Sequence, residues 1–196
     1  MEYTKEDIAY LQSFRNRIDY DGIKIKQQIK QALLNNKHII HVLNNKELED
    51  ADAEPDDYFN VNIIPTYMIA PTQHSVQNFI CYTVSFTDVP QYDKTKKFQQ
   101  IVFVILCEQK NIIDKDTSLP RHDLLAALIQ DQFNYTNLLG SKVKLVKDRE
   151  LVVDNNYACR ELTFEQYVDN NLVRTRGGIP RLTNKEAYVE VPQSKD

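Results

Sequence analysis

The segment Phe98–Cys107, with the sequence FQQIVFVILC, limits the possible folds of this chain more than any other segment. From Ile101 onward every residue is apolar, so a β-strand here would carry apolar side chains on both faces. Other parts of the chain must cover both faces of such a strand. We therefore predict that 98–107 is the central strand of a sheet.

The segment before it, Asn78–Phe86, alternates between two sets of side chains, as a β-strand does. One face would carry Ile80, Tyr82, Val84 and Phe86, and the other Phe79, Cys81, Thr83 and Ser85. The polar connection 88–97 has about the length of a long hairpin loop, so we expect the two strands to pair antiparallel. Two more strands are predicted beside a turn at 154–156: a short one at 142–146 and a longer one at 157–168.

Four segments have helical character. They are 4–17, 23–34, the short 38–43, and 121–133. The first begins with Thr4 and Asp7, which fit a capping box. The segment Ile63–Ile69 contains Pro65 and is predicted to be an edge strand or irregular. The acidic residues 44–57 are predicted to form a loop.

This order of elements predicts an α+β fold, with a mostly antiparallel sheet and packed helices. The core domain would span 36–168, and a helical extension, 1–35, would precede it. The last segment, 169–196, has little periodicity and contains Gly177, Gly178, Pro180 and Pro192. It is predicted to be an extended arm.

The composition excludes several classes of function. The 24 cationic and 28 anionic residues give a net charge of −4, whereas proteins that act mainly on nucleic acid are usually basic. Only four glycines are present, and neither glycine-rich phosphate motif occurs. The start of the chain does not resemble a signal peptide, and no apolar run is long enough for a membrane span. We expect no cofactor.

The sequence Arg121-His122-Asp123, at the start of the 121–133 helix, has two interpretations. It could be half of a catalytic dyad, or it could be an ordinary helix start. We favour the helix start, because side chains of adjacent residues project in different directions. Asp123 would then accept hydrogen bonds from free backbone N–H groups, and Arg121 would pair outward with Asp123, Asp131 or another subunit.

The remaining candidate residues are interface residues rather than catalytic ones. Residues 47–57 hold seven carboxylates, but Pro55 and Val61 stand where a calcium-binding EF-hand needs Gly and Glu. His38 and His41 share a helix face without further converging ligands, so no metal site is expected. The expected interface and fold-organising residues are Arg121, Asp123, Arg160, Arg174, Arg176, Arg181, Asp50, Asp52 and Asp56. Arg160 is expected to pair across the sheet.

Six segments, read together, resemble the tail completion proteins of long-tailed bacteriophages, also called tail terminator or head–tail joining proteins. They are IIHVLNNKELED (39–50), DDYFNVNIIPTYMI (56–69), NFICYTVSFTDVPQYD (78–93), KFQQIVFVILC (97–107), PRHDLLAALIQDQFN (120–134) and DNNYACRELTFE (154–165). The recurring patterns include a helix that opens with a basic residue two positions before Asp-Leu. They also include a closing strand with the pattern aromatic–x–x–Arg–x–Leu–x–Phe, here Tyr157 to Phe164.

This resemblance implies a structural virion protein without enzymatic activity, assembled in the host cytoplasm and located at the phage neck. It implies a homo-oligomer, usually a six-fold ring, that caps the tail tube protein and joins it to connector or neck proteins. DNA would pass through the lumen without specific binding. The acidic loop and the basic arm would give successive subunits complementary charge.

Two alternatives remain open at this stage. A neighbouring connector adaptor, head-completion protein or tail-tube protein would differ only in its partner. A small cysteine hydrolase, or an accessory protein for nucleic-acid processing, would belong to a different class and would use Cys81, Cys107 or Cys159 with a distant histidine. We expect these cysteines to be reduced core thiols, because each lies within an apolar strand pattern.

Overall fold

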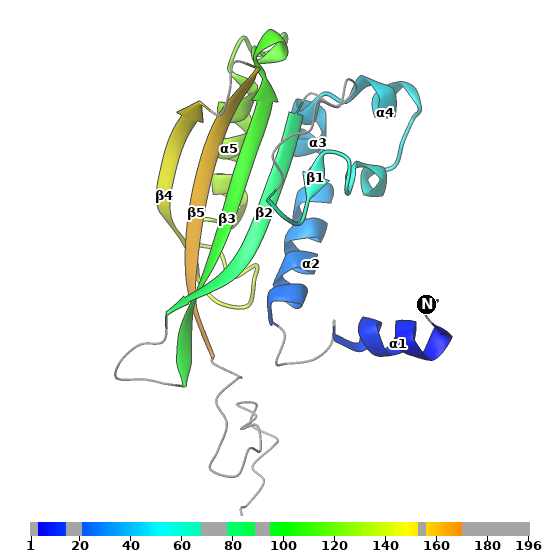
Figure 1. The fold of residues 1–196 in the computed structure, drawn as a ribbon. Helices are drawn as coiled ribbons and strands as arrows, with labels where there is room; N and C mark the ends of the chain where they lie inside the picture. The colour runs from blue at the N-terminus through cyan, green and yellow to red at the C-terminus, as the bar shows by residue number, and fades with distance from the viewer. Residues whose placement is uncertain (1–3, 15–20, 68–77, 89–94, 153–155, 170–196) are drawn as a thin grey trace, which may run out of the picture.

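The computed structural model describes residues 4–14, 21–67, 78–88, 95–152 and 156–169. They form a five-stranded sheet with helices packed against it (Figure 1). The α+β class predicted from the sequence is confirmed. The strands are β1 (Ile63–Ile64), β2 (Asn78–Asp88), β3 (Lys96–Glu108), β4 (Val143–Val152) and β5 (Tyr157–Asp169).

The strand order is β1-β2-β3-β5-β4, so β3 lies in the middle of the sheet, as predicted. β2, β3, β5 and β4 pair antiparallel, and only the short edge strand β1 runs parallel to its neighbour β2. The expected antiparallel pairing of β2 with β3 is therefore confirmed. β4 continues beyond the predicted 142–146 to Val152, and its pairing with β5 shifts register between Leu145 and Lys147.

The helices are α1 (Lys5–Ser13), α2 (Asp21–Leu34), α3 (Lys37–Leu43), α4 (Lys46–Asp50) and α5 (Arg121–Phe133), with short 3₁₀ helices η2 (Pro55–Tyr58) and η3 (Gln109–Asn111). α1 begins with the expected capping box of Thr4 and Asp7. Asn36 and Asn45 cap α3 and α4 with their side chains. The Asn45 cap and Pro55 at the start of η2 explain why the segment 44–57, predicted to be a loop, contains two short helices instead.

The main core lies between the sheet and the helices α2, α3 and α5. Three buried rings lie at its centre: the centroid of Phe103 is 5.2 Å from that of Phe133 and 5.7 Å from that of Phe164. α2 packs Ile25, Ile29 and Leu33 into this core, although the sequence pattern places these residues in the extension 1–35. We call the sheet face that these helices cover the helix face.

The opposite sheet face, which we call the far face, carries a smaller buried cluster at one end of the strands. This cluster consists of Ile64, Phe79, Cys81, Val104, Leu106 and Cys159. The two side-chain sets predicted for β2 separate as expected, with Ile80 and Tyr82 in the main core and Phe79 and Cys81 in this second cluster. In the part of the chain that the structure describes, no helix is both long and apolar enough to cross a membrane.

Candidate functional site

Two groups of charged residues lie at the start of α5, and the first is buried. The Arg121 side chain is turned into the protein, where Nη1 lies 3.0 Å from Oδ1 of Asp114. The same guanidinium donates to the backbone oxygen of Val42 at 3.1 Å and, through Nε, to that of Asn111 at 3.1 Å. We call Arg121, Asp114 and these two carbonyls the inner clamp. It joins α3, the loop after β3 and the start of α5.

Hydrogen bonds within its own loop hold the Asp114 carboxylate in position to pair with Arg121. Its Oδ2 accepts hydrogen bonds from the backbone N–H of Thr117 at 3.0 Å and from the Thr117 hydroxyl at 2.8 Å. These bonds, together with the charge of Arg121, hold the pKa of Asp114 below its ordinary value. The carboxylate is therefore ionised where it meets the buried guanidinium, and each buried charge has a partner.

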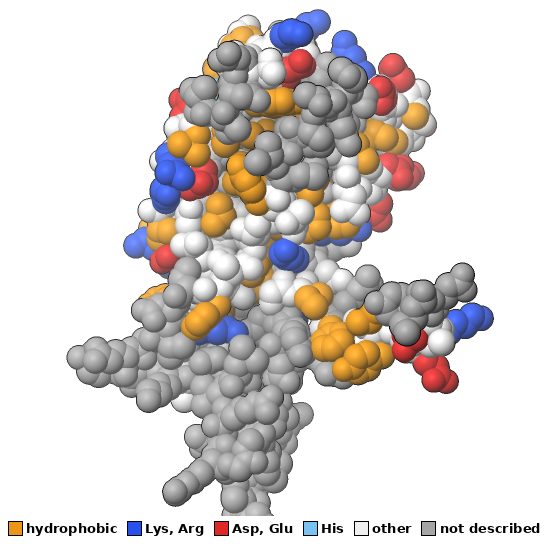
Figure 2. Space-filling model, viewed as in Figure 1, with side chains coloured by type: hydrophobic (Ala, Val, Ile, Leu, Met, Phe, Trp, Pro, Cys, Tyr) orange, Lys and Arg blue, Asp and Glu red, His pale blue; other side chains and the backbone are white. Residues whose placement is uncertain are grey.

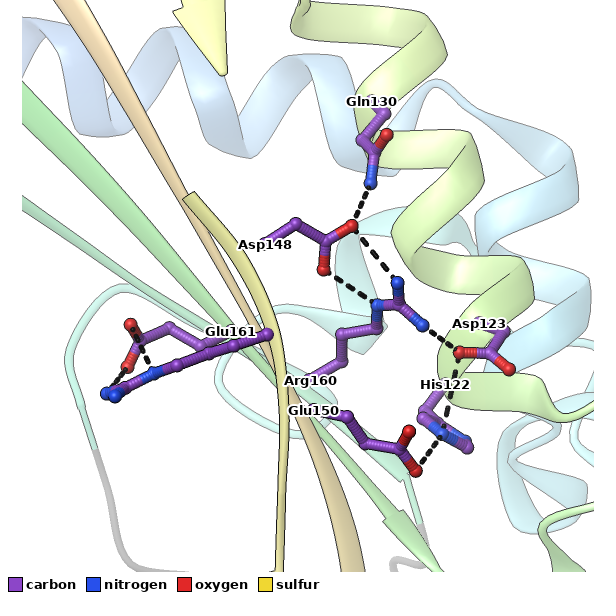
Figure 3. A network of polar contacts seen from close by, with 8 residues as sticks. His122, Asp123, Gln130, Asp148, Glu150, Arg160 and Glu161 are labelled. Carbon is purple, nitrogen blue, oxygen red and sulfur yellow. Dashed lines mark hydrogen bonds and ion pairs between the residues drawn. The ribbon is translucent and has the colours of Figure 1, made fainter. Parts of the chain in front are cut away.

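The second group lies at the edge of the sheet, between α5 and the hairpin of β4 and β5 (Figure 3). Arg160 of β5 donates from Nε and Nη2 to the two oxygens of Asp148 on β4, at 2.8 and 3.0 Å. Its Nη1 donates to Asp123 of α5. Gln130, two turns further along α5, donates to Asp148 at 2.9 Å. We call these residues, with His122 and Glu150, the edge network.

The two-pronged contact between Arg160 and Asp148 matches the fork geometry of guanidinium and carboxylate. Hydrogen bonds from Arg160 are the main reason that the pKa of Asp148 is lowered, and those to Asp148 are the main reason that the pKa of Arg160 is raised. Because the contacts join α5, β4 and β5, the network fixes the helix against the edge strand. The Arg160 side chain remains 26% exposed, so solvent weakens these contacts relative to those of the inner clamp.

His122 lies beneath this network and is almost completely buried. Its Nε2 is 3.5 Å from Asp123 and 3.4 Å from Glu150, which are ion-pair contacts when the ring is protonated. Neither ring nitrogen has a hydrogen bond to the described residues. We expected the side chains of His122 and Asp123 to diverge, yet they approach each other, because Arg160 draws the Asp123 carboxylate toward the sheet. That carboxylate does not make the orienting hydrogen bond of a catalytic dyad.

Two sequence expectations for this region are therefore wrong. Arg121 does not pair outward with Asp123 or Asp131, because its guanidinium is enclosed and bound to Asp114. Asp123 does not cap α5: the N-cap residue is Pro120, and no side chain caps the helix there. The expectation that Arg160 pairs across the sheet is confirmed by its contact with Asp148. The position of Arg121 supports a fold-organising role rather than an interface role.

The other predicted interface residues lie apart from α5. Asp50 ends α4, Asp52 has a left-handed backbone with φ of 51°, and both are exposed. Asp56 lies in η2 and pairs with Lys30 of α2 at 3.2 Å. Their interface role remains a prediction. Arg174, Arg176 and Arg181 lie outside the described residues.

The three cysteines are free and buried. Burial raises the pKa of Cys107 strongly and that of Cys159 to about 11, so neither is a thiolate near neutral pH. Among the residues that the structure describes, no three His, Cys, Asp or Glu side chains gather as metal ligands would. The geometry therefore gives no support to the cysteine-hydrolase alternative.

Sequence reasoning missed Asp148, Gln130 and Asp114. Asp148 could have been found by counting outward from the turn at 154–156, because a hairpin in that register places Arg160 opposite Glu150 and near Asp148. The predicted strand 142–146 ends before Asp148 and therefore leaves this residue out. For Asp114, which lies seven residues before Arg121 in an irregular loop, the sequence contains no comparable signal.

Comparison with known protein families gives a match over most of the chain. A family model described as YomW matches residues 27–166, which is more than two thirds of the chain. A search of curated proteins found no match. The matched region begins within α2 and ends within β5, so it includes the inner clamp and the edge network and leaves α1 outside.

Proposed function

Because the chain belongs to the YomW family, a phage-derived family of the SPbeta type, we propose that it is a structural virion protein of the phage neck. Copies of the chain assemble head to tail into a closed ring. The ring caps the tail tube and joins it to the head connector, and DNA passes through its lumen without specific binding. The protein has no enzymatic role in this proposal.

The observation that carries the proposal is the exposed aromatic surface at one end of the sheet. There β3 and β5 extend beyond the start of α2 (Figure 1). Phe98 and Tyr167, paired across these strands, are 37% and 42% exposed, with ring centroids 5.1 Å apart. On the adjacent strand β2, Phe86 is 53% exposed, but it pairs with Gln99 and lies on the other face of the sheet. We call Phe98 and Tyr167 the sheet end.

Large exposed aromatic side chains that lie together are typical of protein–protein interfaces. Burying such rings against a second subunit removes apolar surface from water at low cost in side-chain entropy. The sheet end is therefore suited to contact another protein chain. Its placement at one end of elongated strands also suits a head-to-tail contact, in which two different surfaces of one chain meet.

The test begins with the assembly state of the purified protein. We expect mass photometry and negative-stain images to show a ring, and we expect that ring to bind the ends of purified tail tubes. The double variant Phe98→Ser/Tyr167→Ser is expected to shift the ring to monomers. The matched control is Tyr67→Ser, which removes a ring of similar exposure, 53%, away from the sheet end.

A protein that stays monomeric at every concentration and ignores tubes and connectors would overturn the proposal. Equal loss of assembly in Tyr67→Ser would remove the sheet end as its basis. The neighbouring roles of connector adaptor, head-completion protein and tail-tube protein differ in their partner. Binding of the ring to purified portal protein, but not to tubes, would favour the connector-adaptor or head-completion role over tail completion.

A further inference from the structure

The second half of β2 lies at an open edge of the sheet. On this edge the backbone N–H of Ile80 donates to the backbone oxygen of Asn62 at 2.7 Å, and β1 pairs with Ile80 and Cys81. Alternate residues of an antiparallel strand direct their backbone groups to the same edge, so those of Val84 and Phe86 point the same way. Among the described residues, no strand pairs with Val84 or Phe86 on that side.

Two features of the sequence keep this edge open. Pro65 follows β1 directly and has no N–H to donate to a neighbouring strand, and the chain bends there. The open part of β2, from Thr83 to Phe86, carries neither a charge nor a proline. Natural proteins usually protect exposed edges with such residues, because an open edge can pair with another chain. The edge is therefore suited to take up an additional strand.

A groove of about 510 Å³ lies beside this open edge, between α2 and the end of β1 (Figure 1). On the visible surface beside α2, Figure 2 shows hydrophobic and cationic side chains close together. Phe86 lies on the same face of β2 as Tyr82 and is 53% exposed, and Ile23 is 41% exposed. A strand on the open edge would cover such apolar surface. The lining of the groove includes Ile23, Lys26, Lys30, Phe59, Pro65 and Tyr82.

The groove also contains a cation that no carboxylate of the described residues pairs with. This cation is Lys26, which is partly buried and donates to the backbone oxygen of Pro65 at 2.5 Å. An ammonium group has three N–H donors, so the contact with Pro65 leaves further donors for a ligand. Lys30, by contrast, already pairs with Asp56 at 3.2 Å. Because a charge that is partly removed from water is stabilised by a partner of opposite charge, the groove should prefer a carboxylate near Lys26.

A ligand for this edge should be an extended segment that combines apolar side chains with a carboxylate. Residues 170–196 follow β5 and lie outside the described part of the chain. Within them, 174–185 holds four cations and no acid, and Lys26 would repel these cations. Residues 186–191, EAYVEV, instead combine strand-forming Tyr and Val with two glutamates. In a strand, one side of this segment would carry an aromatic ring between two carboxylates, from Glu186, Tyr188 and Glu190.

From these features we propose that residues 186–191 of one copy add a strand to the open edge of β2 in a neighbouring copy. The backbone of the segment pairs with the open backbone groups of β2, Tyr188 covers Ile23, and a flanking glutamate pairs with Lys26. Residues 170–185 can span up to about 50 Å when extended, which exceeds the width of a compact domain of this length, about 40 Å. The proposal rests on the assembly into a ring described above, and it identifies one contact between successive copies.

Cysteine cross-linking tests this contact in the full chain, because the native cysteines are all buried. Val189→Cys and Ser85→Cys are purified separately, mixed and oxidised. Ser85 is exposed on the open part of β2 and points away from the groove, as Val189 would, so both changes spare the groove contacts. We expect a disulfide-linked dimer that forms from the mixture and disappears on reduction. The control mixture pairs Val189→Cys with Ile113→Cys, an exposed site after β3, and should give about a tenth as much dimer, because no contact brings its thiols together.

Charge variants give a second measurement that does not depend on oxidation. Lys26→Glu should raise the protein concentration needed for ring formation about tenfold, the equivalent of one charge-assisted hydrogen bond. Adding Glu186→Lys and Glu190→Lys to this variant should restore ring formation, which a change that only damaged the fold would not permit. The control is Lys24→Glu, which makes the same charge change on α2 outside this groove and should leave assembly unchanged. Circular dichroism checks that each variant is folded.

Three results would overturn the proposal. Rings that form normally without the cross-link between positions 189 and 85 would show that the segment does not bind at this edge, while leaving the proposed ring intact. A chain carrying both cysteines that links only within itself would show that the segment pairs with β2 of its own copy. A protein that is monomeric throughout would remove both this proposal and the ring on which it rests.

Discussion

The inner clamp and the edge network both hold α5 with an arginine, but they lie in different surroundings. Arg121 is 7% exposed and its partner Asp114 is 4% exposed, whereas in the edge network the side chain of Arg160 is 26% exposed and that of Asp123 is 41% exposed. Water is thus excluded from the first group and competes with the second. The same type of ion pair therefore fixes the fold where it is buried and only supports the edge of the sheet where it is exposed.

Breaking the inner clamp should have the larger effect. Arg121→Met leaves the Asp114 carboxylate buried without its cation and leaves two backbone oxygens without their donor. We expect the free energy of unfolding to fall by about 3–5 kcal/mol, the usual effect of breaking a buried pair. Urea denaturation followed by circular dichroism measures this change.

The matched control is Lys110→Met, an exposed cation in η3 of the same loop, which should change stability by less than about 0.5 kcal/mol. In addition, Arg121→Met/Asp114→Leu should recover part of the loss, because it removes both buried charges. A loss below about 1 kcal/mol for Arg121→Met would show that the clamp contributes no more than an exposed pair.

Breaking the edge network should have an intermediate effect. Arg160→Gln removes charge-assisted hydrogen bonds to two carboxylates, so we expect a loss of about 1.5–3 kcal/mol. Arg149→Gln is the comparison, because Arg149 is paired with Glu161 on the far face at 2.9 Å and is 47% exposed. This pair joins only β4 and β5, and its loss should cost less than about 1 kcal/mol. Equal losses in Arg160→Gln and Arg149→Gln would contradict the distinction between the helix face and the far face of the sheet.

The smallest expected effect is the dependence of stability on pH. The folded-state pKa of Asp148 is lowered. Its contribution to the free energy of unfolding is therefore present above the pKa of the unfolded chain and is lost as pH falls through the folded-state pKa. The difference in unfolding free energy between the native protein and Asp148→Asn should therefore be constant from about pH 7 to about pH 5 and shrink below about pH 4. Urea titrations at these pH values measure it. A difference that grows in acid would contradict the assignment.

Periodicity made most of the fold predictable. The alternation in 78–86 placed Ile80 and Tyr82 on one face and Phe79 and Cys81 on the other, because side chains of a strand point to alternate faces whatever its neighbours are. The uninterrupted apolar run from Ile101 placed β3 in the centre. By contrast, nothing periodic marks 44–57, where the Asn45 cap and Pro55 produce short helices.

The candidate site was predictable only in part. Arg160 and Asp123 were both identified, but not their contact with each other, since 37 residues separate them in the chain. Arg121 was expected to face outward because an arginine in the first turn opposes the helix dipole. The structure instead compensates this charge with Asp114 and with a carbonyl of α3, which lies 79 residues earlier.

The sequence by itself determined which segments become strands and helices and which of their sides are apolar, because these properties depend on residues a few positions apart. Only the tertiary structure decided which partners the charged side chains take. Asp114, Asp148 and the backbone of Val42 reach their arginines only after α3, α5 and the β4–β5 hairpin have packed around the core. Apolar burial sets that packing, and the charges can pair only where it brings them together.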